Sequence, residues 1–75
     1  MTNELDLVVL RRDLPESQLK AGDVGTVVLQ HAGGRGLEVE FTTLTGETVA
    51  VVTVHEDAVR AVTDGEIAHV RRVAC

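Results

Sequence analysis

The chain has 75 residues, a formal net charge of −5 and a hydrophobic content of 44%. A chain of this length forms one small domain, and its excess of acids makes nucleic acid and anionic membranes poor partners. Phe41 is the only aromatic residue, so the core must be aliphatic. The abundance of valine favours a β-rich core over a helical bundle.

The cysteine content and the first residues of the chain indicate the cellular compartment of the protein. Cys75 is the single cysteine, which excludes a disulfide within the chain and fits a reducing environment. Residues 1–6 are acidic and lack the basic and apolar regions of a signal peptide, and no apolar run approaches the roughly 18 residues that span a bilayer. We therefore expect a cytoplasmic protein with no membrane segment.

A strand and a long polar segment open the predicted fold. Residues 5–10 are mostly apolar on both alternating faces, which indicates a strand covered on both sides for part of its length. In the polar residues 11–21, Pro15 keeps the residue before it out of the helical region, so this segment is extended or turned. Leu14 and Leu19 are expected to fold back over one end of the core.

The next stretch predicts a bent strand followed by a hairpin. A turn at residues 22–23 leads into a second strand at 24–30, where Gly25 lets the backbone bend or approach another strand closely. A glycine-rich turn at 31–36 then leads into a third strand at 37–42. That strand alternates apolar and polar residues, which predicts one buried face and one wet, acidic face.

A second hairpin and a short return complete the predicted sheet. The turn at residues 43–47 places Gly46 where a positive φ is needed. The fourth strand, 48–54, is apolar at nearly every position and is therefore predicted to be central. Residues 55–59 suit one helical or 3-10 turn, because acids at its start favour the helix dipole, and residues 60–62 suit a brief fifth strand.

The chain ends in a tail, residues 63–75. Its Ile67, Val70 and Ala74 fall at near-helical spacing, although the second half of the tail also suits a strand, and both readings stay open. Five short strands, a long first loop and a 3-10 turn before the last strand predict a mainly β domain, an SH3-like barrel at residues 1–62. Another small β-roll, such as an OB-like barrel, is the alternative. The tail packs on this barrel or on a partner.

An ordered set of motifs resembles a known family. The motifs are D-L-P at 13–15, L-x-x-G-x-V-G-T-V-V at 19–28, E-V-E-F at 38–41 and the Gly46-Glu47-Thr48 turn, preceded by the strand at 5–10. They are similar to those of short, stand-alone bacterial proteins that form a domain of unknown function. The resemblance covers residues 5–62. It implies an SH3-like barrel in the bacterial cytoplasm, with no assigned activity and with a neighbouring gene product as a partner, as in toxin–antitoxin pairs. Leu37 stands where members often carry an aromatic, which argues against an aromatic ligand platform.

Two groups of residues are candidate ligand sites. The glycine-rich residues 33–36 could cradle an anion, but the phosphate motif needs a following helix, so a hairpin turn is favoured. The three histidines could form a metal site with nearby acids or with the cysteine, but their spacing matches no zinc pattern. We predict no metal and no cofactor. The metal candidates are His31, His55, His69, Glu56, Asp57 and Cys75.

No catalytic set emerges from the sequence. A terminal Cys75 is seldom held rigidly enough to pair with a histidine, and Glu38 and Glu40 are better explained as a solvated acidic face than as an acid–base pair. We expect a non-enzymatic protein-interaction module that binds another protein or forms a homodimer, with Ile67 and Val70 as one possible dimer contact. The alternatives are a barrel that binds a small ligand or nucleic acid, and a carrier modified at Cys75.

Overall fold

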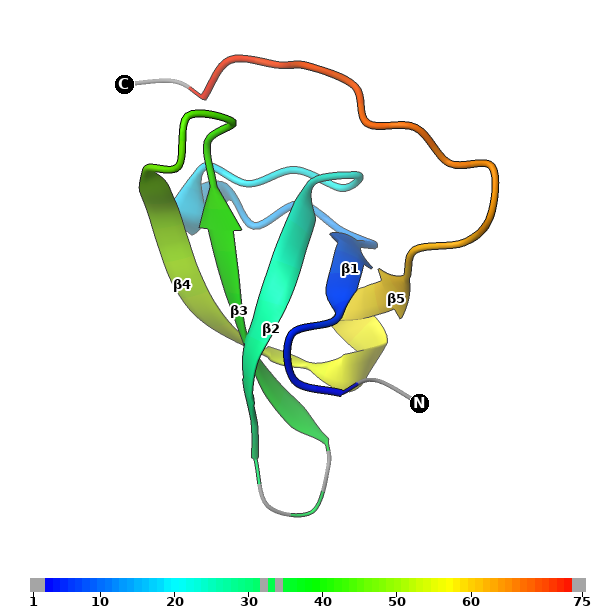
Figure 1. Ribbon diagram of the computed structural model, residues 1–75. Coiled ribbons are helices and arrows are strands. Elements are labelled where there is room, and N and C mark those ends of the chain that lie inside the picture. The colour runs from blue at the N-terminus through cyan, green and yellow to red at the C-terminus, as the bar shows by residue number, and fades with distance from the viewer. Residues whose placement is uncertain (1–2, 32, 34, 74–75) are drawn as a thin grey trace.

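The structure is a computed structural model that describes residues 3–31, 33 and 35–73. Within these residues it contains five β-strands, two 3-10 turns and no α-helix, which confirms the predicted mainly β class (Figure 1). The elements, in chain order, are β1 (Leu7–Leu10), η1 (Pro15–Ser17), β2 (Val24–Gln30), β3 (Gly36–Thr42), β4 (Thr48–His55), η2 (Glu56–Ala58) and β5 (Val59–Ala61).

The five strands form one antiparallel sheet in the order β4-β3-β2-β1-β5. Strands β1 to β4 pair with their neighbours in sequence, and β5 returns to pair with β1. Among the described residues β4 and β5 are the two edges and do not pair with each other, so the predicted closed barrel is not confirmed.

The prediction that the fourth strand is central is wrong, because β4 lies at an edge. The return of β5 to β1 extends the sheet at the opposite end and leaves the last strand of the β2–β3–β4 meander without a second neighbour. Its apolar run was misleading because Val51 is 52% exposed and faces away from the core. Valine is favoured in strands on exposed faces as well as buried ones.

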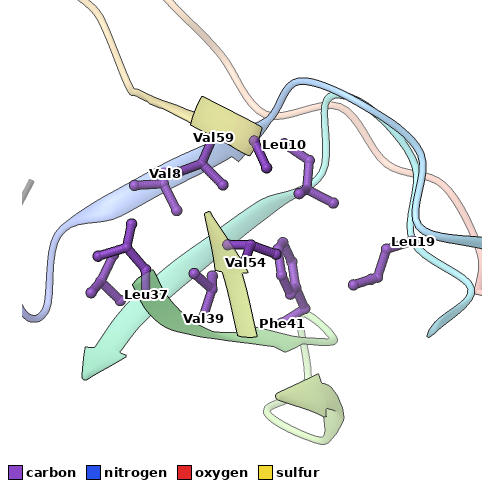
Figure 2. Close-up of a cluster of buried hydrophobic side chains, with 10 residues drawn as sticks. Val8, Leu10, Leu19, Leu37, Val39, Phe41, Val54 and Val59 are labelled. Carbon is purple, nitrogen blue, oxygen red and sulfur yellow. The ribbon is translucent and has the colours of Figure 1, made fainter. Parts of the chain in front are cut away.

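The core lies on one side of the bent sheet (Figure 2). Val27 of β2 is completely buried at its centre, and so are Leu37 and Val39 of β3, as the alternation of β3 predicts. Leu14 and Leu19 form an isolated antiparallel bridge, and Leu19 is buried in the core, which confirms that the first long loop folds back. The whole core cluster consists of Val8, Leu10, Leu19, Val27, Leu37, Val39, Phe41, Val54, Ala58 and Val59.

Gly25 lies where β2 and β3 approach each other closely. A Cβ on this residue would lie 2.6 Å from the Val39 Cγ1 atom and 2.8 Å from the Phe41 Cε2 atom, so the sheet could not pack in this way around any other residue. The predicted role of Gly25 is therefore confirmed. Gly46 also has the expected positive φ, at 94°.

The ends of several elements differ from the predictions. β1 begins at Leu7 rather than at residue 5, because Leu5 has a φ of 71°, which an extended strand does not allow. β5 begins one residue earlier than predicted, since Val59 already fills the core. The predicted turn at 55–59 is confirmed as η2, with a His55 side-chain nitrogen accepting a hydrogen bond from the Asp57 N–H.

The described part of the tail, 63–73, forms neither helix nor strand, so both predictions for it were wrong. Ile67 and Val70 are 92% and 73% exposed, and without a buried surface their near-helical spacing stabilises nothing. The tail instead crosses one end of the domain as an extended segment (Figure 1).

Candidate functional site

The face of the sheet that points away from the core is the candidate site, and we call its β2–β3–β4 part the outer face. Strand register places side chains on it in two cross-strand rows. Thr26, Glu40 and Val51 form the first row, and Leu7 of β1 extends it. Leu29, Glu38 and Thr53 form the second row. Each row thus combines one apolar, one acidic and one threonine side chain across three neighbouring strands.

The outer face combines exposed apolar groups with negative charge. Leu29 and Val51 are 45% and 52% exposed, so both present apolar surface to solvent. β2, β3 and β4 contain no Lys or Arg, so the carboxylates Glu38 and Glu40 set the sign of the charge. The Thr48 hydroxyl donates to Glu40 at 2.7 Å, and His31 Nε2 lies 3.2 Å from a Glu38 oxygen, which orients both carboxylates.

An arginine–carboxylate clamp fixes the start of the tail. Arg60 donates through both terminal nitrogens to Glu66, at 2.9 and 2.6 Å, and the Thr63 N–H donates to the same carboxylate at 2.7 Å. The hydrogen bond from Arg60, followed by that from Thr63, lowers the pKa of Glu66 from 4.5 to about 2. The clamp closes a tight turn that redirects the chain away from β5.

The clamp predicts a measurable acid titration. Because the pKa of Glu66 is lowered on folding, the clamp is complete above pH 4.5 and is lost as the pH falls towards 2. We expect a carbon-13 NMR titration of the Glu66 carboxyl to show a midpoint near 2. Arg60→Gln should raise that midpoint towards 4.5, and a wild-type midpoint already near 4.5 would show that the clamp does not form in solution.

A second clamp holds the end of the described tail against the β1–β2 loop. Arg71 Nε donates to Asp23 at 2.9 Å, a Nη2 hydrogen bond reaches the other Asp23 oxygen, and the same Nη2 donates to the Gln18 carbonyl at 3.1 Å. Partial burial raises the pKa of Asp23, but hydrogen bonds from Arg71 and from the Lys20 N–H outweigh it and leave that pKa below its ordinary value. Asp23 thus caps its own turn through Lys20 and anchors the tail.

Among the residues that the structure describes, the candidate metal ligands are not brought together. His31 lies beside Glu38, and His55 Nδ1 lies 3.1 Å from an Asp57 oxygen, so these two histidines contact different carboxylates. Within residues 3–31, 33 and 35–73 no group of three His, Cys, Asp or Glu side chains could hold a metal ion. Cys75 lies outside the described residues, as do two positions of the glycine-rich turn.

A shallow hollow of about 460 Å³ separates η1 from β4. Apolar side chains dominate its lining, and Glu16, Ser17 and Thr53 are its polar side chains. No histidine lines it, and neither Glu38 nor Glu40 reaches it. The residues around it are Leu14, Pro15, Glu16, Ser17, Val52, Thr53 and Val54.

The fold and the outer face define a small, mainly β domain with an exposed acidic and apolar surface. A family model for a domain of unknown function, DUF4926, matches residues 4–61, and the chain belongs to this family. The match confirms the resemblance read from the motifs and ends where β5 ends. Comparisons with curated proteins and with solved structures found no match. No helix in the described part of the chain is long and apolar enough to cross a membrane.

Sequence reasoning found part of the site and missed the rest. It identified the wet, acidic face of β3, because Glu38 and Glu40 alternate with buried residues. It missed the two tail clamps, since Arg71 and Asp23 lie 48 residues apart and no local pattern links them. Arg60 and Glu66 are six residues apart, a spacing that indicates an ion pair only once the intervening turn is known.

Proposed function

We propose that this chain is a non-enzymatic protein-interaction domain and that the outer face is its binding surface. The supporting observation is the set of exposed apolar side chains beside Glu38 and Glu40 on three strands without Lys or Arg. A partner of matching chemistry presents apolar side chains flanked by Lys or Arg. Apolar contact supplies most of the binding free energy in such a complex, and the charges supply orientation and partner choice.

Charge and chemistry favour a protein partner over the alternatives. Nucleic acid would require an excess of cations, but the chain has twelve acids against seven bases, and Arg12, Arg60 and Arg71 are each paired with a carboxylate. The carboxylates of the outer face are half-buried and lie outside the hollow between η1 and β4, which argues against acid–base catalysis. A single cysteine favours a reducing compartment, and we propose the bacterial cytoplasm.

The test is affinity capture from cells of the source organism by tagged wild-type protein and by a charge-reversal variant. Glu40 lies at the centre of the first row, opposite Thr26 and Val51. Glu40→Lys is expected to reduce the amount of captured partner at least tenfold, because it sets a like charge against the cations of the partner. Quantitative mass spectrometry of the eluates measures this ratio.

Asp64→Lys serves as the matched control. It makes the same change in net charge at an exposed tail position away from the outer face. The control should capture as much partner as the wild type, and both variants should melt at nearly the wild-type temperature. Equal capture by Glu40→Lys and wild type would contradict the proposed surface, and the absence of any stoichiometric partner would contradict the proposed function.

A further inference from the structure

The two edges of the sheet are built differently. β5 has three residues, and β4 has eight. Exposed strand edges tend to pair with other chains, and monomeric proteins protect them with short strands, charged side chains, prolines or covering segments. β5 is short and carries Arg60, whereas β4 has eight residues with no charged side chain and no proline, and η1 lies beside its second half.

Arginine side chains seal the β5 edge. The Arg11 N–H donates to the Ala58 carbonyl, so these two residues form a hydrogen-bonded pair. Hydrogen-bonded and non-hydrogen-bonded pairs alternate along an antiparallel ladder. Val59 and Ala61 therefore direct their peptide groups away from β1. The carbonyls of these two residues accept hydrogen bonds from Arg11 Nε at 3.1 Å and Arg60 Nη1 at 3.0 Å. Both outward carbonyls of β5 are therefore occupied.

The β4 edge has no such protection. The Glu56 N–H donates to the Arg35 carbonyl, and this hydrogen-bonded pair continues the register of β3 and β4. By the same alternation, the peptide groups of Val51, Thr53 and His55 point away from β3. β4 contains no Asp, Glu, Lys, Arg, Pro or Gly, and among the described residues it pairs with β3 alone. A row of donors and acceptors is thus open along an uncharged, valine-rich strand.

We infer that β4 pairs antiparallel with β4 of a second copy of this chain. Two copies that each carry a net charge of −5 repel each other wherever carboxylates meet, and β4 is the uncharged edge along which this cost is smallest. A two-fold axis perpendicular to the sheet at Val51 pairs that residue with its own symmetry mate. The same axis places Glu47 opposite His55 of the second copy, an opposite-charge pair when the imidazole is protonated.

The surroundings of β4 leave room for this second strand. The hollow of about 460 Å³ between η1 and Val52–Val54 lies beside the second half of β4. Antiparallel pairing brings the first half of the second copy's β4 to this place. The resulting sheet of two copies carries both outer faces on the same side. Such a dimer presents two outer faces, either to one partner or to two. The inference therefore goes beyond the proposed function.

Sedimentation equilibrium with the purified full chain tests the inference. At about 100 µM we expect a mass of twice the 8.0 kDa chain, since an edge-to-edge strand pair is smaller than a standard interface and gives micromolar affinity. Thr53→Pro removes a peptide N–H that the domain does not itself use, so it should yield a folded monomer. Val51→Lys should also yield a monomer, because it sets two ammonium groups against each other at the axis while pairing with Glu40 inside each copy.

Leu7→Lys is the matched control, because Leu7 is 54% exposed in the same cross-strand row but lies on β1. It should remain dimeric. A monomeric wild type, a dimeric and folded Thr53→Pro or Val51→Lys, or a monomeric Leu7→Lys would each overturn the inference. If Thr53→Pro does not fold, Val51→Lys decides. Partner capture through Glu40 is measured separately, so a monomeric wild type that still captures partner refutes the dimer and leaves the proposed function intact.

Discussion

Val27→Asp is expected to unfold the domain at neutral pH. Val27 has no exposed surface, and its neighbours in the core are aliphatic side chains and Phe41. Keeping the new carboxyl protonated at pH 7, about three units above its ordinary pKa, costs about 4 kcal/mol. The lost burial of valine adds about 2 kcal/mol. A domain of this length has a free energy of unfolding of about 4–11 kcal/mol, so the variant loses most or all of it.

The neighbouring Val28→Asp is the control for this prediction. Val28 is 39% exposed and lies at the irregularity between β2 and β3, so the same substitution there places a carboxylate in water. Circular dichroism melting should show a cooperative transition for Val28→Asp and none for Val27→Asp at pH 7. Cooperative melting of both variants near the wild-type temperature would contradict the described core.

The pH dependence of Val27→Asp gives a second check. The folded-state pKa of the buried carboxyl is raised, so its cost is fully present above that raised pKa and disappears below the ordinary value near 4. The free-energy difference between variant and wild type, compared at one pH, should therefore shrink as the pH falls to about 4. A difference that does not change with pH would mean that the new side chain reaches solvent.

The local elements of the fold were readable from the sequence because their signals are local. The alternation of β3 predicts its buried residues Leu37, Val39 and Phe41, and Gly46 marks the hairpin that precedes β4. The 3-10 turn before β5 follows from acids at its start. Each of these signals lies within a few consecutive residues. Over such a short stretch, the local secondary structure follows from backbone preference and from the two-residue period of strands.

The order of the strands was not readable, because it depends on a contact between β1 and β5, which lie far apart in the sequence. Val9 pairs with Arg60, and nothing in either segment specifies the other. Without this pairing the valine-rich β4 looks central, and its open edge is overlooked. The prediction for the tail failed for a related reason. The hydrogen bond between Arg71 and the distant Asp23 fixes the course of the tail, and the spacing of its apolar residues does not.

Gly25→Val is expected to destabilise the domain nearly as much as a charge in the core. Even a methyl group here would lie 2.6 Å from Val39 Cγ1 and 3.0 Å from the Glu40 carbonyl oxygen. The carbonyl belongs to the backbone of β3 and cannot move without breaking the pairing of β2 with β3. Overpacking of a tight core costs about 1–3 kcal/mol when side chains can adjust, and we expect more than about 3 kcal/mol where backbone blocks the adjustment.

Gly46→Ala separates this steric effect from the loss of glycine itself. Gly46 has a φ of 94°, but no atom lies within 4 Å of its missing Cβ, so alanine there meets backbone strain without a clash. That strain costs about 1–2 kcal/mol. Urea unfolding should therefore show a far lower midpoint for Gly25→Val than for Gly46→Ala, although only the second glycine has a positive φ. Equal midpoints would mean that β2 and β3 do not approach closely at Gly25, and the bend of the sheet would need another cause.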